Sequence, residues 1–178
     1  MTEQELISKL VEMEEILRNK YYGKYRGIVR ELGTEDRLSE IKVEIPEVYG
    51  VNQTSPWVKA VLPFAGPGYG TLFLPSEGDG VWVEFEAGDI SRPIWVGFWW
   101  SSQDEIPEPS ALTARVTVTP NGHKIILDDE NDEIQVIHSN GPLLKLTGEE
   151  ITIQNDSASI VITGSEVNIN NGALVVSS

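Results

Sequence analysis

Cysteine is absent from this 178-residue chain, which excludes a disulfide framework, a cysteine-based metal site and a thiol nucleophile. Long apolar runs are also missing. The longest aromatic-rich run, residues 94–100, is interrupted by Gly97 and is too short to span a bilayer as a helix. Basic residues are few, with 13 Lys and Arg against 28 Asp and Glu, so the formal net charge is −15. Such a charge repels phosphate backbones and anionic membranes, and we expect no nucleic-acid partner.

The beginning of the chain is acidic, with Glu3 and Glu5 where a secretory signal would be basic. We therefore expect assembly in the cytoplasm without a signal peptide. A role outside the cell would then require export as part of a larger particle.

Residues 1–20 are predicted to form an amphipathic helix. Thr2 and Glu5 fit a capping box, in which each side chain accepts a hydrogen bond from an unpaired amide at the helix start. The apolar residues that follow share one helical face: Leu6, Leu10, Met13 and Leu17, widened by Ile7, Val11 and Ile16. This face could pack on its own domain or dock on a neighbouring subunit or hub protein, because the spacing also suits a coiled-coil seam.

Residues 21–100 contain five short β-type runs separated by Gly, Pro and Asp, at 22–29, 40–45, 57–62, 81–86 and 94–99. Five short strands with turn residues between them predict a small closed barrel such as an OB-fold. Residues 101–110 are polar and proline-rich, and no aromatic residue occurs after Trp100. We interpret this stretch as a linker between two domains.

Residues 111–178 form a series of alternating β-type runs that recur every 7–10 residues, broken by dipeptides such as Asn121-Gly122 and Thr147-Gly148. A monomer built from such short runs would have a thin core. Three chains wound around one axis would instead stack their runs on each other and bury one continuous apolar column. An ordinary antiparallel sandwich is the alternative. The predicted trimer core consists of Ile126, Ile134, Val136, Leu144, Leu146, Ile151, Ile153, Ile160, Ile162, Val167, Ile169, Leu174 and Val176.

An ordered series of short motifs runs through the middle segment. The motifs are Lys42-Val43-Glu44-Ile45-Pro46, Ser55-Pro56-Trp57-Val58, Pro63-Phe64-Ala65-Gly66-Pro67-Gly68-Tyr69-Gly70, Leu74-Pro75-Ser76-Glu77-Gly78-Asp79, Val81-Trp82-Val83-Glu84-Phe85, Gly88-Asp89, Arg92-Pro93-Ile94 and Val96-Gly97. In this order they resemble the OB-fold domain of baseplate assembly protein V and related phage tail-spike proteins, a domain shared with the valine-glycine repeat proteins of type VI secretion.

The resemblance implies an all-β fold: a five-stranded OB-fold barrel followed by a trimeric intertwined β-helix, with a short N-terminal α-helix. The run from Asn121 to Asp129 looks like the opening of that β-helix. It further implies a homotrimeric structural spike of a phage tail, tailocin or other contractile injection system. Such a spike contacts tail tube and baseplate hub proteins and pierces the target cell envelope as part of a virion tail or an extracellular injection particle.

Two features of some family members have no counterpart here. The ten-residue linker leaves no room for a lysozyme domain, and His123 and His138 do not form the His-x-His motif that holds an apex iron. The C-terminal end, residues 173–178, could therefore be a blunt platform for a separate tip protein.

Catalytic chemistry has little support in the sequence. The carboxylates of residues 128–133 lie in one polar loop, which is more typical of a solvated turn than of a glycosidase pair or a calcium site. We predict no catalytic residue, no cofactor, no metal and no enzymatic activity. Two alternatives remain: an oligomeric OB-fold module that binds a glycan or nucleic acid on a β-stalk, with its five tryptophans as a stacking platform, and a cell-wall-degrading enzyme.

Overall fold

The computed structural model describes residues 2–18 and 20–177, and the chain divides into two compact units, residues 1–101 and 102–178. Strands dominate both units, in agreement with the all-β class predicted from the sequence. Each unit is described by itself below.

The first unit begins with helix α1, Glu3–Arg18. The predicted capping box is confirmed: the backbone N–H of Thr2 donates to Glu5 Oε2 at 2.7 Å, and the N–H of Glu5 donates to Thr2 Oγ1 at 3.3 Å. None of the described residues of α1 is buried. The helix therefore does not pack its apolar face on its own domain, which was one of the two interpretations of the sequence.

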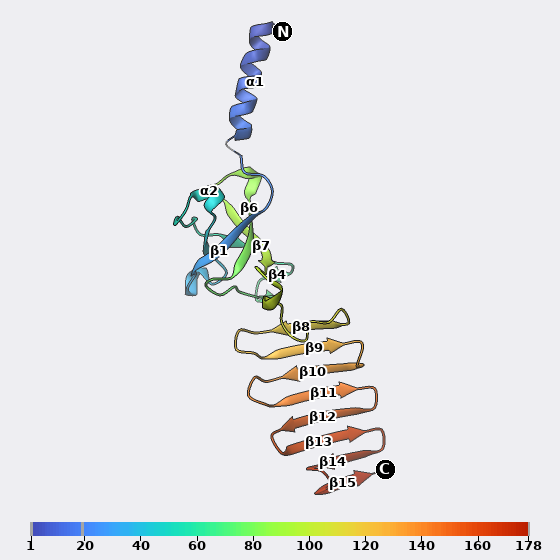
Figure 1. The fold of residues 1–178 in the computed structure, drawn as a ribbon. Helices are drawn as coiled ribbons and strands as arrows, with labels where there is room; N and C mark the ends of the chain where they lie inside the picture. Colours follow the sequence, from blue (N-terminus) through green and yellow to red (C-terminus); the bar gives the residue numbers. More distant parts are fainter. Residues whose placement is uncertain (1, 19, 178) are drawn as a thin grey trace. The chain divides into compact units, whose positions relative to one another are not determined.

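All five strands predicted for residues 21–100 exist and belong to one sheet in the order β2-β1-β6-β7-β3. Their bounds are β1 Tyr25–Leu32, β2 Ile41–Glu44, β3 Lys59–Ala60, β6 Gly80–Phe85 and β7 Pro93–Trp99. Strands β1, β2, β6 and β7 pair antiparallel, whereas β3 pairs parallel to β7. In Figure 1 these strands curl around each other in the first unit.

The sheet closes into a barrel at Ile41 and Val58. The N–H of Ile41 donates to the carbonyl of Val58 at 3.1 Å and the N–H of Val58 donates back at 2.8 Å, which joins the first strand of the sheet to the segment leading into the last. Closure removes the exposed sheet edges. The interior is filled by Val29, Ile41, Val43, Ile45, Val58, Val81, Val83, Phe85 and Trp95.

Two details of the barrel interior depend on small or polar residues. Gly27 faces the core, where an added Cβ would lie 3.3–3.4 Å from Val43, Ile45 and Val83. Among residues 2–18 and 20–177, Ser55 is the one buried polar residue, and its Oγ accepts a hydrogen bond from the N–H of Val43 at 3.0 Å. A buried hydroxyl with a partner avoids the cost of an unsatisfied polar group.

Several short elements between the strands were not expected from the sequence. They are helix α2 at Pro46–Tyr49, the small hairpin of β4 (Ala65–Gly66) and β5 (Tyr69–Gly70), and the 3-10 turns Glu35–Arg37, Glu86–Gly88 and Gln103–Glu105. Elements of four residues or fewer carry too little periodicity to be seen in a sequence.

The second unit is an eight-stranded sheet in which each strand pairs antiparallel with the next along the chain, from β8 to β15 (Figure 1). The strands are β8 Ala114–Val118, β9 Lys124–Asp128, β10 Glu133–Ile137, β11 Leu143–Thr147, β12 Glu150–Asn155, β13 Ala158–Thr163, β14 Glu166–Ile169 and β15 Leu174–Ser177. All eight match runs predicted from the sequence. Their hydrogen-bond partners are runs of the same chain, whereas the sequence interpretation stacked them on runs of other chains.

Short polar side chains fix the turns of this meander. Thr147 Oγ1 accepts hydrogen bonds from the amides of Glu149 and Glu150, and Thr163 Oγ1 repeats this pattern sixteen residues later with the amides that follow it. Side-chain acceptors of this kind hold a tight turn in place. The turns that the Thr-Gly dipeptides predicted therefore have a defined chemical basis.

Candidate trimerisation face

The eight-stranded sheet has one face built almost entirely of aliphatic side chains. The register aligns these residues in two ladders that cross seven strands. One ladder is Ile125, Val136, Leu144, Ile153, Ile160, Ile169 and Leu174, and the other is Leu127, Ile134, Leu146, Ile151, Ile162, Val167 and Val176. We call these fourteen residues the apolar face. Side chains alternate along a strand, so this face requires an apolar residue at every second position of each strand.

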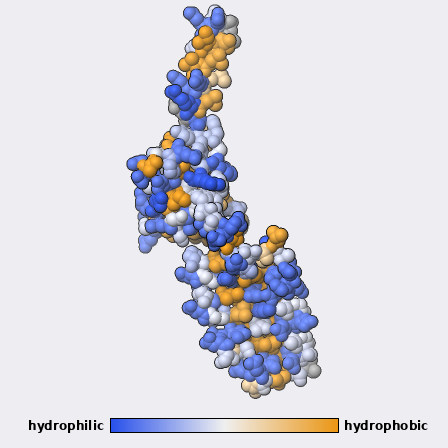
Figure 2. All heavy atoms as spheres, in the orientation of Figure 1, coloured by the Kyte–Doolittle hydropathy of each residue, from blue (hydrophilic) through white to orange (hydrophobic). Residues whose placement is uncertain are grey.

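The apolar face is uncovered in a single chain. Ten of its fourteen residues have 36–60% of their surface exposed, including Ile153 at 48%. Part of the face forms an open groove of about 610 Å³ that runs across strands β10–β14. Figure 2 shows apolar atoms gathered in a band across the strands of this unit. A contiguous apolar surface of this size is typical of a protein–protein interface.

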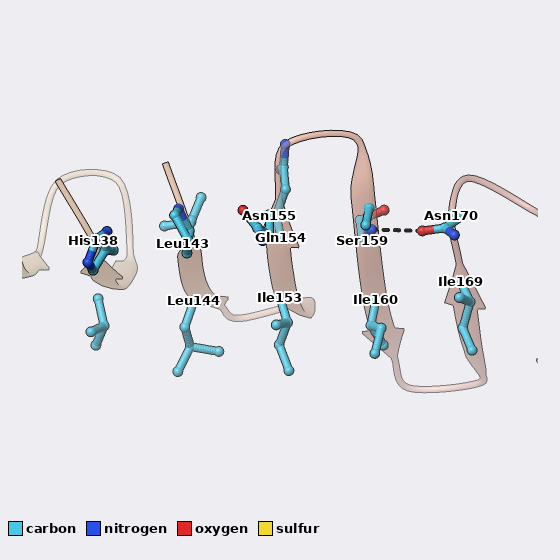
Figure 3. A pocket seen from close by; sticks show the side chains of 13 residues that line it. His138, Leu143, Leu144, Ile153, Gln154, Asn155, Ser159, Ile160, Ile169 and Asn170 are labelled. Atoms are coloured by element: carbon cyan, nitrogen blue, oxygen red, sulfur yellow. Dashed lines mark hydrogen bonds between the residues drawn. The ribbon is translucent and has the colours of Figure 1, made fainter. Parts of the chain in front are cut away.

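Figure 3 shows how the groove is organised. Leu144, Ile153, Ile160 and Ile169 form one row across neighbouring strands, and the second row beside it is polar except for Leu143. In that polar row Asn170 Oδ1 accepts a hydrogen bond from the N–H of Ser159 at 3.0 Å. The polar row satisfies backbone groups at the strand ends and leaves the aliphatic row free to contact another apolar surface.

The opposite face of the same sheet is mixed. Its central ladder reads Val116, Ile126, Gln135, Lys145, Thr152, Val161, Asn168 and Val175. Lys145 on this side forms an ion pair with Glu133. In this ladder Ile126 is 6% exposed, Val175 is exposed and the other residues are half-buried, so the two faces differ in composition and in exposure.

Twelve of the thirteen core residues predicted from the sequence lie together on the apolar face. Ile126 does not, because it pairs with Gln135 and Val116 on the opposite side. The run Ile125-Ile126-Leu127 is apolar at three consecutive positions, so alternation could not decide which residues share a face. The register places Ile125 and Leu127, and not Ile126, on the face that holds the other twelve residues.

The tryptophans of the barrel are largely engaged within the chain. Trp95 lies in the core at 3% exposure. The guanidinium of Arg26 lies 5.4 Å from the ring centre of Trp82 and 5.2 Å from that of Trp99, and Lys42 Nζ lies 4.6 Å from that of Trp57. Each cation–π contact occupies one face of its ring, whereas Trp100 is 59% exposed.

His123 and His138, far apart in the sequence, come together at the start of the sheet with ring centres 4.4 Å apart. His123 Nδ1 accepts from the N–H of Ser139 at 3.3 Å, and His138 Nδ1 accepts from the N–H of Asn140 at 3.2 Å. Both rings therefore contact backbone amides of the loop that follows β10. Within residues 2–18 and 20–177, no group of three or more His, Asp and Glu side chains converges.

The ionisable groups with shifted pKa values serve the local structure. A hydrogen bond from the Arg30 side chain lowers the pKa of Glu44, and one from the Asn131 side chain lowers that of Asp128. Hydrogen bonds from Ser91 and Ser110 lower the pKa values of Asp89 and Glu108. A general acid in glycoside hydrolysis requires the opposite shift, a raised carboxyl pKa. Asp128, in the acidic loop, also accepts from the amide of Glu130 and is used to form its own turn.

Comparison with known families assigns both units. Residues 25–100 match the model of the type VI secretion system/phage-baseplate injector OB domain, and residues 115–175 match that of the phage baseplate V C-terminal trimerisation domain. No described helix is long and apolar enough to cross a membrane.

A closed five-stranded barrel followed by a sheet with one bare apolar face defines a structural, trimer-forming component of a phage baseplate or injection system. The chain belongs to the family of phage baseplate V and type VI secretion spike proteins.

Proposed function

We propose that this protein is the central spike of a contractile injection system or phage tail, where a homotrimer caps the tail tube and pierces the target cell envelope. The apolar face is the observation that supports this proposal most strongly. Ten half-exposed aliphatic side chains lie on one face of a small sheet, and their burial requires another apolar surface. The match to a trimerisation domain supports copies of the same chain as the source of that surface.

The trimer core consists of the two aliphatic ladders of the apolar face. Three sheets arranged around one axis, each with this face turned inward, bury all three faces at once and present the mixed faces to water. Burying an aliphatic side chain completely contributes on the order of 1.5–3 kcal/mol, and these side chains begin about half exposed, so each contributes a part of that. Fourteen positions per chain repeat this contribution along the axis.

The same arrangement suits a mechanical role. Neighbouring strands lie about 4.8 Å apart, so eight strands extend over roughly 34 Å along the direction of their hydrogen bonds. Compression along this direction presses the ladders together rather than pulling them apart. A trimer of this kind transmits force through its backbone hydrogen bonds and its continuous apolar centre.

The two ends of the chain have different proposed partners. Residues 21–100 form the OB-fold domain, which contacts the tail tube and hub proteins, and residues 111–178 form the spike domain, joined to it by the linker 101–110. At the far end, β15 is the last strand of the sheet, so one edge of its backbone has no neighbouring strand in the same chain. An edge strand at the end of the column is a suitable platform for a separate tip protein.

The mass of the purified chain in solution tests the proposal. We expect a particle of three times the 19.7 kDa chain mass at micromolar concentration, measured by light scattering coupled to size exclusion. A monomer would contradict the proposed homotrimer. Turnover of peptidoglycan or polysaccharide, or binding on a glycan array, would favour one of the two alternative functions instead.

A further inference from the structure

Helix α1 carries a second exposed apolar surface. Leu6, Leu10, Met13 and Leu17 are 45–62% exposed, and the apolar residues beside them are exposed to the same degree. Figure 2 shows apolar atoms gathered along one side of this helix. An isolated helix of sixteen residues is marginally stable in water, so this surface requires a partner.

We propose that the α1 helices of three copies of this chain form a short parallel three-helix coiled coil. This proposal rests on the trimer proposed above. The spacing of Leu6, Leu10, Met13 and Leu17, alternately four and three residues, places them at positions d, a, d and a of a heptad. Ile7 and Ile16 fall at the flanking e and g positions and widen the seam, which suits a bundle of more than two helices.

The charged residues favour the parallel arrangement. Lys9 lies at position g and Glu14 at position e of the next heptad, five residues later. In a parallel coiled coil, a g residue of one helix faces the e residue of the following heptad in its neighbour, so Lys9 faces Glu14 of another copy. Around a three-fold axis this pairing occurs three times. Of the remaining acidic residues, Glu5, Glu12 and Glu15 fall at c and f, which face water, and Glu3 falls at an a position in the first turn of the helix.

Two heptads alone would associate weakly, but α1 is not alone. The trimerisation domain of the same chain holds three copies together and thereby raises the effective concentration of their helices. It also imposes the parallel direction, since the three chains are joined in the same orientation. Continuity with that interface makes further copies of this chain a better occupant of the seam than a helix of a hub protein.

Engineered cysteines test this arrangement directly, because the chain has none of its own. In the full-length protein, Leu10→Cys places three thiols around the proposed axis, within the Cα separation of about 4.4–6.8 Å that a disulfide requires. Mild oxidation should give a covalent dimer on a non-reducing gel, since three thiols on one axis can form only one disulfide. Ser8→Cys, at the outward f position, is the matched control and should cross-link at least tenfold more slowly.

The charge pair supplies an independent test of the register. Lys9→Glu added to the Leu10→Cys protein should slow its cross-linking, and the swap Lys9→Glu with Glu14→Lys should restore it. Solution mass is measured for every variant, because it tests the trimer independently of the coiled coil of α1. A trimer in which Leu10→Cys cross-links no faster than Ser8→Cys overturns the coiled coil and leaves a hub protein as the partner of α1. A swap that does not restore cross-linking overturns the parallel register.

Discussion

The barrel and the eight-stranded sheet use similar β-strands in opposite ways. In the barrel, seven aliphatic side chains are at most 1% exposed within one chain, whereas ten aliphatic residues of the apolar face are 36–60% exposed. The barrel therefore completes its core alone, and the sheet leaves its core to be completed by assembly.

The connections between strands explain this difference. The links between consecutive strands of the barrel sheet have at least seven residues, which allows β3 to return beside β7 and the segment before it to close on β2. The links of the second unit have two to five residues. Connections that short allow a strand to pair only with the next one, so the result is an open meander with no second layer.

The largest expected effect is on assembly. Ile153→Asp places a carboxylate in the middle of one ladder of the apolar face, between Leu144 and Ile160. Burying an unpaired charge is costly, so we expect the trimer to be lost at micromolar concentration, while the far-UV circular dichroism of the barrel persists. Light scattering provides the measurement.

Val161→Asp is the matched control for this change. Val161 lies in the neighbouring strand on the opposite face, half-buried and paired with the polar residues Thr152 and Asn168. We expect this variant to remain a trimer. If Ile153→Asp also yields a soluble, stable trimer, the apolar face is not the trimer core.

Mutations in the barrel core are expected to change its free energy of unfolding independently of trimer formation. Ile41→Ala removes a side chain that is 1% exposed at the point of barrel closure and should cost about 2–5 kcal/mol of unfolding free energy. This loss should not depend on protein concentration, because the core lies within one chain. Urea unfolding, followed by tryptophan fluorescence at two protein concentrations, measures it. A loss that grows on dilution would mean that the barrel core also depends on the trimer.

Alkaline pH should act on the barrel through Tyr49. Burial raises the pKa of Tyr49 to about 12, and its hydroxyl donates to the carbonyl of Ile90 at 2.8 Å. The pKa of Tyr49 is higher in the folded protein than the value near 10 of the unfolded chain, so deprotonation of Tyr49 destabilises the fold. The contribution of the protonated hydroxyl to the free energy of unfolding is complete below pH 10 and is lost as the pH rises toward 12. Tyr49→Phe should unfold with a weaker pH dependence over this range, and equal slopes for the two proteins would refute the role of Tyr49.

The smallest expected effect concerns a turn of the sheet. Thr147→Ala removes the hydroxyl that accepts from the amides of Glu149 and Glu150 and should cost about 1 kcal/mol or less. Faster amide exchange should be confined to the β11–β12 turn, with the trimer intact. Thr163→Ala, which removes the same acceptor from the β13–β14 turn, is the control and should leave exchange at the β11–β12 turn unchanged.

Much of the local structure followed from the sequence because the signals are local. Alternation in each run, such as Ile151, Thr152 and Ile153, together with the Asn-Gly and Thr-Gly dipeptides between runs, was enough to predict all eight strands of the second unit. The capping box of α1 could be predicted as well, because Thr2 and Glu5 are only three residues apart. The barrel motifs identified the family before any contact was known, and the match over residues 25–100 agrees.

Only the tertiary structure decided the register between strands and which residues distant in the sequence lie close together. Three consecutive apolar residues, Ile125, Ile126 and Leu127, fit either face of a strand, and only their pairing with β10 decided which two join the apolar face. His123 and His138 meet because a meander brings residues fifteen positions apart to neighbouring strand ends. Alternation along a strand is a property of neighbouring residues, whereas the partner across a sheet depends on every turn between them.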